Sequence, residues 1–459
     1  MNESQSNSFL AEQPVGALMR KFSLPCILSL LVGALYNIVD QLFIANASYL
    51  GSYGNAANSV VFPLTVIALA IATMIGDGCC AYVSIRLGAG EQEQAHRSVG
   101  NAIVLTLIVS VVLTAVYLIF MDPILTAFGA TVNAETFALS REYCFWIALG
   151  IPFYMFGQAM NPIIRSDGSP RYAMLSLLAG AVCNIILDPI LIFGLGWGVR
   201  GAAVATVLSQ AVGACWILKF LTGPKTILKL RKENLKVERN IILPVLGLGI
   251  SSFVMLSTES LLSISFSSSL ARYGGDVAVG AMTVITSVSQ LCTMPIQGIC
   301  QGGQPVMSFN FGAGKKPRVK EAFRFQLTLC FGYTTLFWLL MMLAPGAVAG
   351  IFTSDTALID YTTWSMRIYM AGIFAMGFQI ACQQSFMALG QAKVSLLLAC
   401  LRKIILLIPL IFILPHLLPD PVFGVFLAEP VSDILAAIIT TITFFSRFNG
   451  ILERGAAKV

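Results

Sequence analysis

The sequence contains few charged residues. Of its 459 residues only 11% are Asp, Glu, Lys or Arg, whereas 57% are hydrophobic, and the mean hydropathy is +0.83. A soluble domain carries about 25% charged residues, so this composition excludes an ordinary water-soluble fold and favours a chain embedded in lipid. The net charge of +6 is modest, and the basic residues fall in predicted loops on one side, which argues against binding to nucleic acid.

The sequence also lacks the patterns of common catalytic and metal sites. Its two histidines, His96 and His416, fall in predicted loops without a catalytic partner. The eleven cysteines are odd in number and lack metal-ligand spacing, so we expect packing residues rather than disulfides or a zinc site. No glycine-rich run has the Lys and strand context that a phosphate-binding loop requires. We therefore expect neither an enzyme, nor ATP-driven activity, nor a cofactor.

Long apolar runs dominate what is present. A bilayer core about 30 Å thick requires about 20 apolar residues per helix. This measure predicts an all-α integral membrane fold with twelve spans, at residues 22–45, 57–83, 99–120, 138–161, 172–194, 200–220, 241–268, 277–305, 320–343, 361–387, 394–415 and 422–446.

Loop charge gives the orientation. We assign twenty basic residues to one face and two, Arg200 and Arg272, to the other. The positive-inside rule then predicts a multi-pass protein of the cytoplasmic membrane with both termini in the cytoplasm.

The chain divides into two similar halves. The segment "LGAGEQEQAHR" at 87–97 recurs as "FGAGKKPRVKE" at 311–321. We predict an N-terminal six-helix bundle at 1–221, a basic cytoplasmic linker at 222–240 and a C-terminal six-helix bundle at 241–459. Because each half has an even number of spans, the repeats are parallel.

Carboxylates interrupt the apolar runs. Asp40 in the first span and Glu259 in the seventh each follow a proline by fifteen residues, so they lie at the same depth. Asp188 in the fifth span reaches a similar level. An unpaired acid at the bilayer centre costs about 2.5–3.5 kcal/mol. Two acids without a base should share a proton or bind a hard cation such as Na⁺. The alternative is a structural, protonated Asp.

Polar neighbours extend this cluster. The predicted cation-coupling residues are Asn37, Asp40, Asn184, Asp188 and Thr206, of which the last four are possible Na⁺ ligands. The second half has Ile408 where the first has Asp188, and we expect Glu259 to stand alone there and to bind cationic substrate. Arg402 and Asp433 lie at comparable depths, which predicts a structural ion pair.

The whole chain resembles one transporter family. Twelve spans in two repeats, "NIVDQLFIA", "NIILDPILIFG" and "GVRGAAVATVLSQ" are similar to the multidrug and toxic compound extrusion (MATE) family, and "STESLL" with "EPVSDILA" is similar to its MepA-like branch. The resemblance implies a V-shaped pair of six-helix bundles that exports cationic or amphipathic small molecules in exchange for Na⁺ or H⁺. It also implies that Asp40, Asn184, Asp188 and Thr206 couple the cation. Oligomerisation is not required.

A substrate path is expected between the halves. Apolar and amide side chains would line it: Met74, Gln158, Asn161, Gln290, Gln297 and Gln383. The alternative for any one of them is an amide that bonds across packed helices. Two other functions compete with export. One is a flippase for a lipid-linked precursor, and the other is a membrane enzyme or scaffold.

Overall fold

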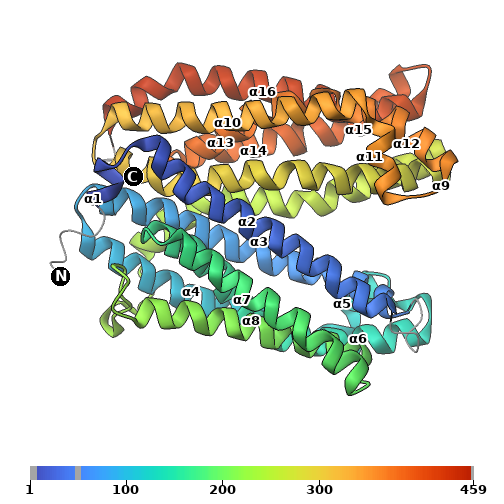
Figure 1. The fold of residues 1–459 in the computed structure, drawn as a ribbon, viewed down its shortest axis with the longest axis horizontal. Coiled ribbons are helices and arrows are strands. Elements are labelled where there is room, and N and C mark those ends of the chain that lie inside the picture. Colours follow the sequence, from blue (N-terminus) through green and yellow to red (C-terminus); the bar gives the residue numbers. More distant parts are fainter. Residues whose placement is uncertain (1–7, 47–52, 456–459) are drawn as a thin grey trace. The chain divides into compact units, whose positions relative to one another are not determined.

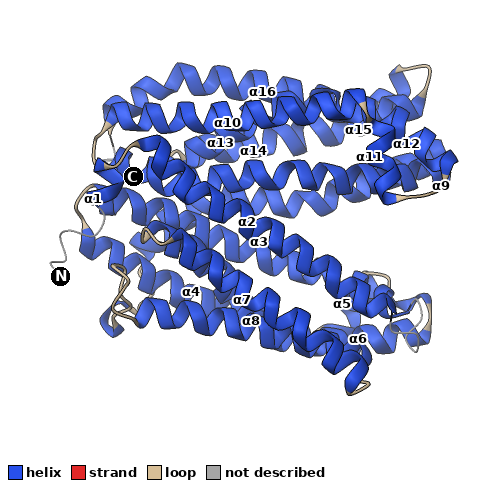
Figure 2. Ribbon diagram, in the orientation of Figure 1, coloured by secondary structure: helices blue, strands red, loops and turns tan. Residues whose placement is uncertain are grey.

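The computed structural model describes residues 8–46 and 53–455, and these residues form helices and loops without a strand (Figure 2). The first half contains α1 Ser8–Glu12, α2 Val15–Asn46, α3 Tyr53–Gly88, α4 Gln92–Ile119, α5 Met121–Ala127, α6 Ala134–Ser166, α7 Pro170–Pro189 and α8 Gly198–Thr222. The second contains α9 Arg239–Gly312, α10 Lys316–Leu343, α11 Pro345–Phe352, α12 Thr356–Tyr369, α13 Ile373–Ala388, α14 Ala392–Cys400, α15 Ile408–Leu417 and α16 Pro421–Arg454 (Figure 1).

Eleven helical segments of the described residues are long and apolar enough to cross a membrane. The count is eleven rather than twelve because α9 contains both the predicted span 241–268 and the predicted span 277–305. At 1.5 Å per residue its 74 residues would extend about 111 Å, far more than a bilayer. Gly275, with φ of 66°, breaks the helix, and the chain turns back there (Figure 1). The all-α membrane fold is therefore as predicted.

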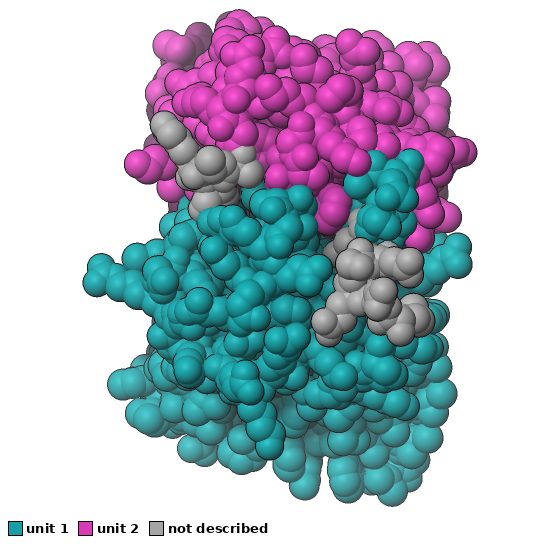
Figure 3. Space-filling model, turned by 90° about the vertical axis from the view of Figure 1, so that its left-hand side faces the viewer, with its two compact units in different colours: residues 1–12, 28–253 teal, residues 13–27, 254–459 magenta. Residues whose placement is uncertain are grey.

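The chain forms two compact units (Figure 3). Unit 1 comprises Met1–Glu12 and Leu28–Phe253, and unit 2 comprises Gln13–Ile27 and Val254–Val459. These limits differ from the predicted 1–221 and 241–459, because α2 and α9 each begin in one unit and end in the other. The first turns of α2 pack in unit 2, and the first turns of α9 pack in unit 1.

Glycines make this exchange of helix ends possible. In unit 1, a Cβ atom at Gly78 would lie 2.0 Å from the Val245 carbonyl oxygen, so α3 and α9 cross with their backbones in contact. In unit 2, a Cβ atom at Gly302 would lie 2.5 Å from the Ser23 backbone. Gly78 and Gly302 are separated by the same 224 residues as the repeated loops. The two crossings are therefore equivalent in the two halves.

The linker is fixed to unit 1 by a buried carboxyl group. Asp167, in the turn between α6 and α7, accepts hydrogen bonds of 2.8 Å from the Thr226 hydroxyl and from the Ile227 and Leu228 amides. Burial raises the pKa of Asp167 to about 7, although these three hydrogen bonds act in the opposite direction. The segment predicted as a basic linker is thus a strap with defined contacts.

The end of the strap has a second attachment. The Glu238 amide donates to the Asn101 side chain at 2.5 Å, and Arg97 forms an ion pair with the Glu238 carboxylate. Both partners belong to α4, so α4 and the α6–α7 turn together hold the strap.

One more basic residue belongs to the face predicted to lie outside, in addition to Arg200 and Arg272. Arg141, near the start of α6, lies at the end of unit 1 predicted to face outward, where it pairs with Asp122 of α5 at 2.9 Å. Arg200 at this end packs against the rings of Trp146 and Trp197. The cytoplasmic location of the termini stays a prediction. All eleven cysteines are free thiols.

Candidate functional site

Two carboxyl groups meet inside unit 1. Asp40 on α2 is 7% exposed and Asp188 on α7 is 0% exposed, and the two carboxyl groups act on each other electrostatically. The Asn184 side-chain amide, one turn before Asp188, donates to Asp188 Oδ1 at 3.4 Å. Two buried carboxylates repel each other, so the pair favours a bound proton or a bridging cation.

Four oxygen atoms at this place are buried without a hydrogen-bond partner in the described part of the chain. They are Asp40 Oδ1, Asn184 Oδ1, Asp188 Oδ2 and Thr206 Oγ1. Thr206 lies on α8 near Asn184, because Gly180 of α7 packs against Ser209 of α8 and the two helices are antiparallel. A buried oxygen without a partner costs about 1–3 kcal/mol. These four oxygens are therefore available to a proton or a cation.

The surroundings supply no compensating charge. The phenols of Tyr36 and Tyr143 lie within the electrostatic field of both carboxyls. Across residues 8–46 and 53–455, no basic side chain is among the groups that act on Asp40 or Asp188. The predicted fifth member, Asn37, is exposed, whereas Thr206 is half-buried and Asp40, Asn184 and Asp188 are buried.

The donor set fits a hard monovalent cation or a proton. The described residues contain no group of three or more His, Cys, Asp or Glu side chains able to hold a metal, so a site for a transition metal is not indicated there. Two carboxyls, one amide and one hydroxyl offer oxygen atoms alone, which suits Na⁺.

A cavity of about 80 Å³ lies in unit 1, and neighbours of the carboxyl pair form part of its wall. Tyr36, one turn before Asp40, and Thr206 both line it, together with Gln158 of α6 and the small residues Gly180 and Ala181 of α7. The wall is mainly apolar with a few polar groups, as in sites for small organic molecules. Of the predicted substrate residues, Gln158 lies here.

The other predicted substrate residues of unit 1 have different surroundings. Asn161 is buried, and its side chain donates to the Ala173 carbonyl at 2.9 Å and to Ser176 Oγ at 3.4 Å. This amide bonds across α6 and α7, which is the alternative considered above. Met74 is half-buried on α3, where its backbone contacts Gly249.

The predicted substrate-binding residues of unit 2 also differ from one another in exposure and contacts. Gln290 is exposed and Gln297 is half-buried, both on α9. Gln383 of α13 is buried, accepts a 2.7 Å hydrogen bond from Gln379 Nε2 and donates to Met255 Sδ at 3.2 Å. Gln383 therefore belongs to a polar network rather than to an open path.

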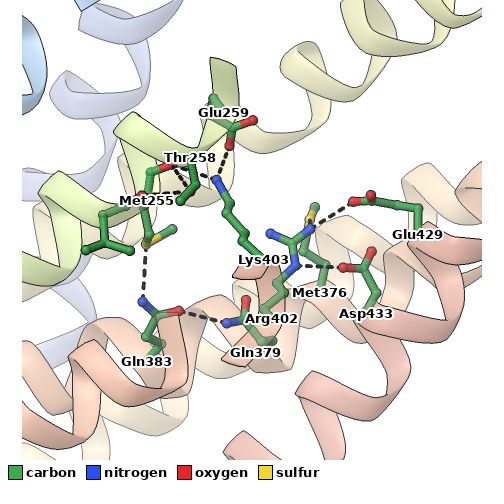
Figure 4. A network of polar contacts seen from close by, with 11 residues as sticks. Met255, Thr258, Glu259, Met376, Gln379, Gln383, Arg402, Lys403, Glu429 and Asp433 are labelled. Carbon is green, nitrogen blue, oxygen red and sulfur yellow. Dashed lines mark hydrogen bonds and ion pairs between the residues drawn. The ribbon is translucent and has the colours of Figure 1, made fainter. Parts of the chain in front are cut away.

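Glu259 does not stand alone, which corrects the expectation above. Lys403 Nζ pairs with the Glu259 carboxylate and also donates to the Met255 carbonyl at 2.7 Å (Figure 4). The Glu259 side chain is 62% exposed, whereas that of Lys403 is 4% exposed. The carboxylate expected to await a cationic substrate is thus already neutralised.

Arg402 and Asp433 form the predicted ion pair. Arg402 Nε lies 2.7 Å from Asp433 Oδ1, and Arg402 Nη2 lies 3.1 Å from Glu429 Oε1 (Figure 4). Depth along the helices indicated the first contact. The positions of Glu429 and Asp433, four residues apart on α16, could have indicated the second.

Sequence reasoning missed the pairing of Lys403 with Glu259 and the cavity. Lys403 follows Arg402 directly and belongs to the π-helix Leu401–Leu407. Neighbouring side chains on a helix point about 100° apart, so Lys403 faces α9 while Arg402 faces α16. The adjacent basic residues were the available signal, but the partners depended on tertiary packing.

Known proteins are similar to this chain over nearly its full length. The MatE family profile matches residues 25–190 and 251–413. The multidrug export protein MepA of Staphylococcus aureus (strain N315) is 26% identical over 434 residues, which cover 94% of each chain. MepA of Staphylococcus haemolyticus (strain JCSC1435) is 24% identical over 436 residues with the same coverage.

Solved structures share the fold. The outward-facing conformation of a multidrug resistance MATE family transporter of the MOP superfamily aligns with a TM-score of 0.90 at 24% identity, over 98% of this chain and 99% of that one. A crystal structure of MATE in the bent conformation aligns with a TM-score of 0.91 over the same shares. Since the family profile covers more than half of the residues, this multi-pass membrane protein belongs to the MatE family.

Proposed function

We propose that the protein exports cationic or amphipathic small molecules across the cytoplasmic membrane in exchange for Na⁺ or H⁺. Membership of the MatE family and similarity to proteins named multidrug export protein support the direction and the substrate class. The observation that carries the coupling is local. It is the buried pair of Asp40 and Asp188, which act on each other without a base and lie among four oxygen atoms that have no hydrogen-bond partner in the described part of the chain.

The ion changes the charge of a buried site. With a proton or Na⁺ bound, the pair carries one negative charge less than the empty pair. One charge at the bilayer centre is worth about 2.5–3.5 kcal/mol, so loaded and empty forms favour different surroundings. A difference of this size shifts a two-state equilibrium about seventy- to several-hundredfold.

Exchange follows if ion and substrate satisfy the same carboxyls. Tyr36, one turn before Asp40, and Thr206 line the cavity, so a molecule in it would lie near the pair. A cationic group in that cavity would compensate Asp40 and Asp188 in place of the ion, and both together would overcompensate them. Competition of this kind makes release of one partner favour binding of the other.

The test is efflux from proteoliposomes with Na⁺ and pH gradients imposed separately. A fluorescent monocation should move against its gradient with one of the two ions, and that ion is the coupling ion. Asp40→Asn and Asp188→Asn should each abolish this movement, while the yield and thermal unfolding of the protein stay close to those of the parent. Asp122→Asn, which changes an exposed carboxylate of the same unit, is the matched control and should transport normally.

Two outcomes would contradict the proposal. One is gradient-driven transport by both carboxyl variants at the parental rate. The other is the absence of dye transport combined with translocation of a fluorescent lipid-linked pyrophosphate, which would establish the flippase instead.

A further inference from the structure

Unit 2 contains a buried polar network that the proposed coupling site does not use. Its charged members come from three places in the chain: Glu259 on α9, Arg402 and Lys403 on the π-helix 401–407, and Glu429 and Asp433 on α16 (Figure 4). A π-helical turn adds one residue to the helix and often marks a functional site. Here it directs two adjacent basic side chains toward different helices.

The charges of this network do not balance. Lys403 is matched by one carboxylate, Glu259, whereas Arg402 faces two, Glu429 and Asp433. Three acids and two bases leave one excess negative charge. Because Glu259 is largely exposed and Glu429 and Asp433 are buried, the excess falls on the buried triad of Arg402, Glu429 and Asp433.

The other groups that face the triad are neutral. Tyr369 of α12 and the Cys292 thiol of α9 lie within its electrostatic field. Lys403 acts on both carboxyls of the triad from its position beside Glu259, and it is already included in the charge count. The excess of one negative charge therefore holds when these groups are included.

A buried acceptor beside Arg402 also lacks a partner. Gln379 of α13 is 1% exposed and donates to Gln383 at 2.7 Å, but its Oε1 has no hydrogen-bond partner in the described part of the chain. Figure 4 shows the Gln379 side chain next to Arg402. The network thus has one excess negative charge and one buried acceptor without a donor.

We propose that the triad of Arg402, Glu429 and Asp433 is a proton-binding site of unit 2, with one proton held by the two carboxyls. A proton fits better than a metal ion. The Arg402 guanidinium already lies 2.7 and 3.1 Å from the two carboxyls, so a metal ion between them would face a full positive charge at short range.

The site has a consequence for Glu259. When the triad loses its proton, its net negative charge attracts Lys403, which already lies within its field. Movement of Lys403 toward Glu429 leaves the exposed Glu259 carboxylate free for a cationic molecule. When the triad is protonated, Lys403 neutralises Glu259. The proton therefore controls whether unit 2 offers an anionic site.

Infrared spectroscopy tests proton occupancy without any transport measurement, so its result is independent of the proposed function. The full-length Asp40→Asn/Asp188→Asn protein in lipid nanodiscs removes the carboxyls of unit 1. Its spectrum near neutral pH should contain the C=O stretch of a protonated carboxyl of the triad. Adding Glu429→Gln, or separately Asp433→Asn, should remove the intensity of one carboxyl, because Arg402 is then balanced by the single remaining carboxylate. Adding Glu453→Gln, at an exposed position near the end of α16, should leave the band unchanged.

The result is the difference between variants, because Asp167 also titrates near this pH. An unchanged band in both Glu429→Gln and Asp433→Asn would overturn the proposal. Loss of the band on addition of Na⁺ at constant pH would also overturn it, because a cation would then replace the proton.

Cation binding tests the link to Glu259 in the same background. Binding of tetraphenylphosphonium should weaken about fivefold or more as the pH falls through the titration of the triad. Glu259→Gln should abolish this pH-dependent binding, and Glu429→Gln should make it independent of pH. An identical pH dependence in Glu429→Gln and in the background would show that the triad does not control Glu259.

Discussion

The two units differ in how their buried carboxyl groups are compensated at equivalent helices. In unit 1, α7 and the π-helix Ile190–Gly194 border two acids without a base, whereas in unit 2 the π-helix Leu401–Leu407 carries two bases that compensate three acids. Gly168 and Gly390 both have positive φ and precede α7 and α14 at an offset of 222 residues. With this offset, the small residues Gly180 and Ala181 correspond to Arg402 and Lys403.

Packing supports this correspondence. Gly180 lies against the Ser209 backbone, and the Arg402 carbonyl accepts a 2.9 Å hydrogen bond from Ser432, which follows Ser209 by 223 residues. The cavity of unit 1 is therefore open where unit 2 contains two long basic side chains. Gly180 and Ala181 line the cavity of unit 1, and neither supplies a base to the carboxyl pair.

The strongest way to break the comparison is to give unit 1 the residue of unit 2. Gly180→Arg would place a guanidinium one turn from Asn184, fill the cavity and compensate the carboxyl pair. We expect it to abolish ion-dependent efflux as completely as Asp188→Asn does. A Cβ atom at position 180 would lie 3.2 Å from the Ser209 carbonyl oxygen. Gly180→Ala therefore isolates the effect of this close contact from that of the guanidinium, and it should retain most of the efflux activity. Efflux of a monocation from proteoliposomes is the measurement, and an active, ion-dependent Gly180→Arg protein would refute the correspondence.

The second test removes the compensation in unit 2. Arg402→Met leaves Glu429 and Asp433 buried without their base, and breaking such an ion pair costs about 3–5 kcal/mol. We expect a large fall in the thermal unfolding temperature. The triple change Arg402→Met/Glu429→Gln/Asp433→Asn removes all three charges and should recover much of the loss. A single variant as stable as the parent would mean that the ion pairs contribute little to unit 2.

The sequence predicted some of the differences between the two units and missed others. Depth along the helices sufficed for Asp40, Asp188 and the Arg402–Asp433 pair, because those partners lie on helices whose lengths are set by the bilayer. The division into units could not be predicted. The exchange of helix ends depends on backbone contact at Gly78 and Gly302, and the sequence does not show which helix a glycine approaches.

The contacts of the predicted substrate-binding amides could not be predicted from the sequence for a similar reason. Asn161 and Gln383 are equivalent amides in the two halves, yet one bonds across α6 and α7 while the other joins Gln379 and Met255. An amide satisfies many partners, so its type and depth do not define its role. Likewise, the absence of a second Asp near Ile408 suggested that Glu259 is isolated. Its partner, Lys403, lies five residues before Ile408, and the sequence does not show that this side chain faces α9.

A third, smaller effect concerns Glu259. Glu259→Gln should weaken export of a monocationic dye about two- to fivefold, equivalent to 0.4–1 kcal/mol for a largely exposed charge pair, and should spare a neutral substrate. The ion dependence of efflux should stay intact, because Asp40 and Asp188 are unchanged. Glu259→Gln/Lys403→Met controls for a buried Lys403 without its counter-ion. Loss of the ion response in Glu259→Gln would place coupling in unit 2 instead of unit 1.

The smallest expected effect concerns Asp167, which holds the strap that joins the halves. Burial raises the pKa of Asp167 from 3.8 to about 7 in the folded protein, so the folded chain binds this proton more tightly than the unfolded chain. The contribution of this proton to stability is therefore fully present below pH 3.8 and is lost as the pH rises through about 7. Asp167→Asn cannot titrate and keeps an oxygen acceptor for Thr226. The thermal unfolding temperature of the parent relative to that of Asp167→Asn should accordingly fall between pH 6 and pH 8. An equal pH dependence of the unfolding temperature in the two proteins would show that Asp167 makes no such contribution.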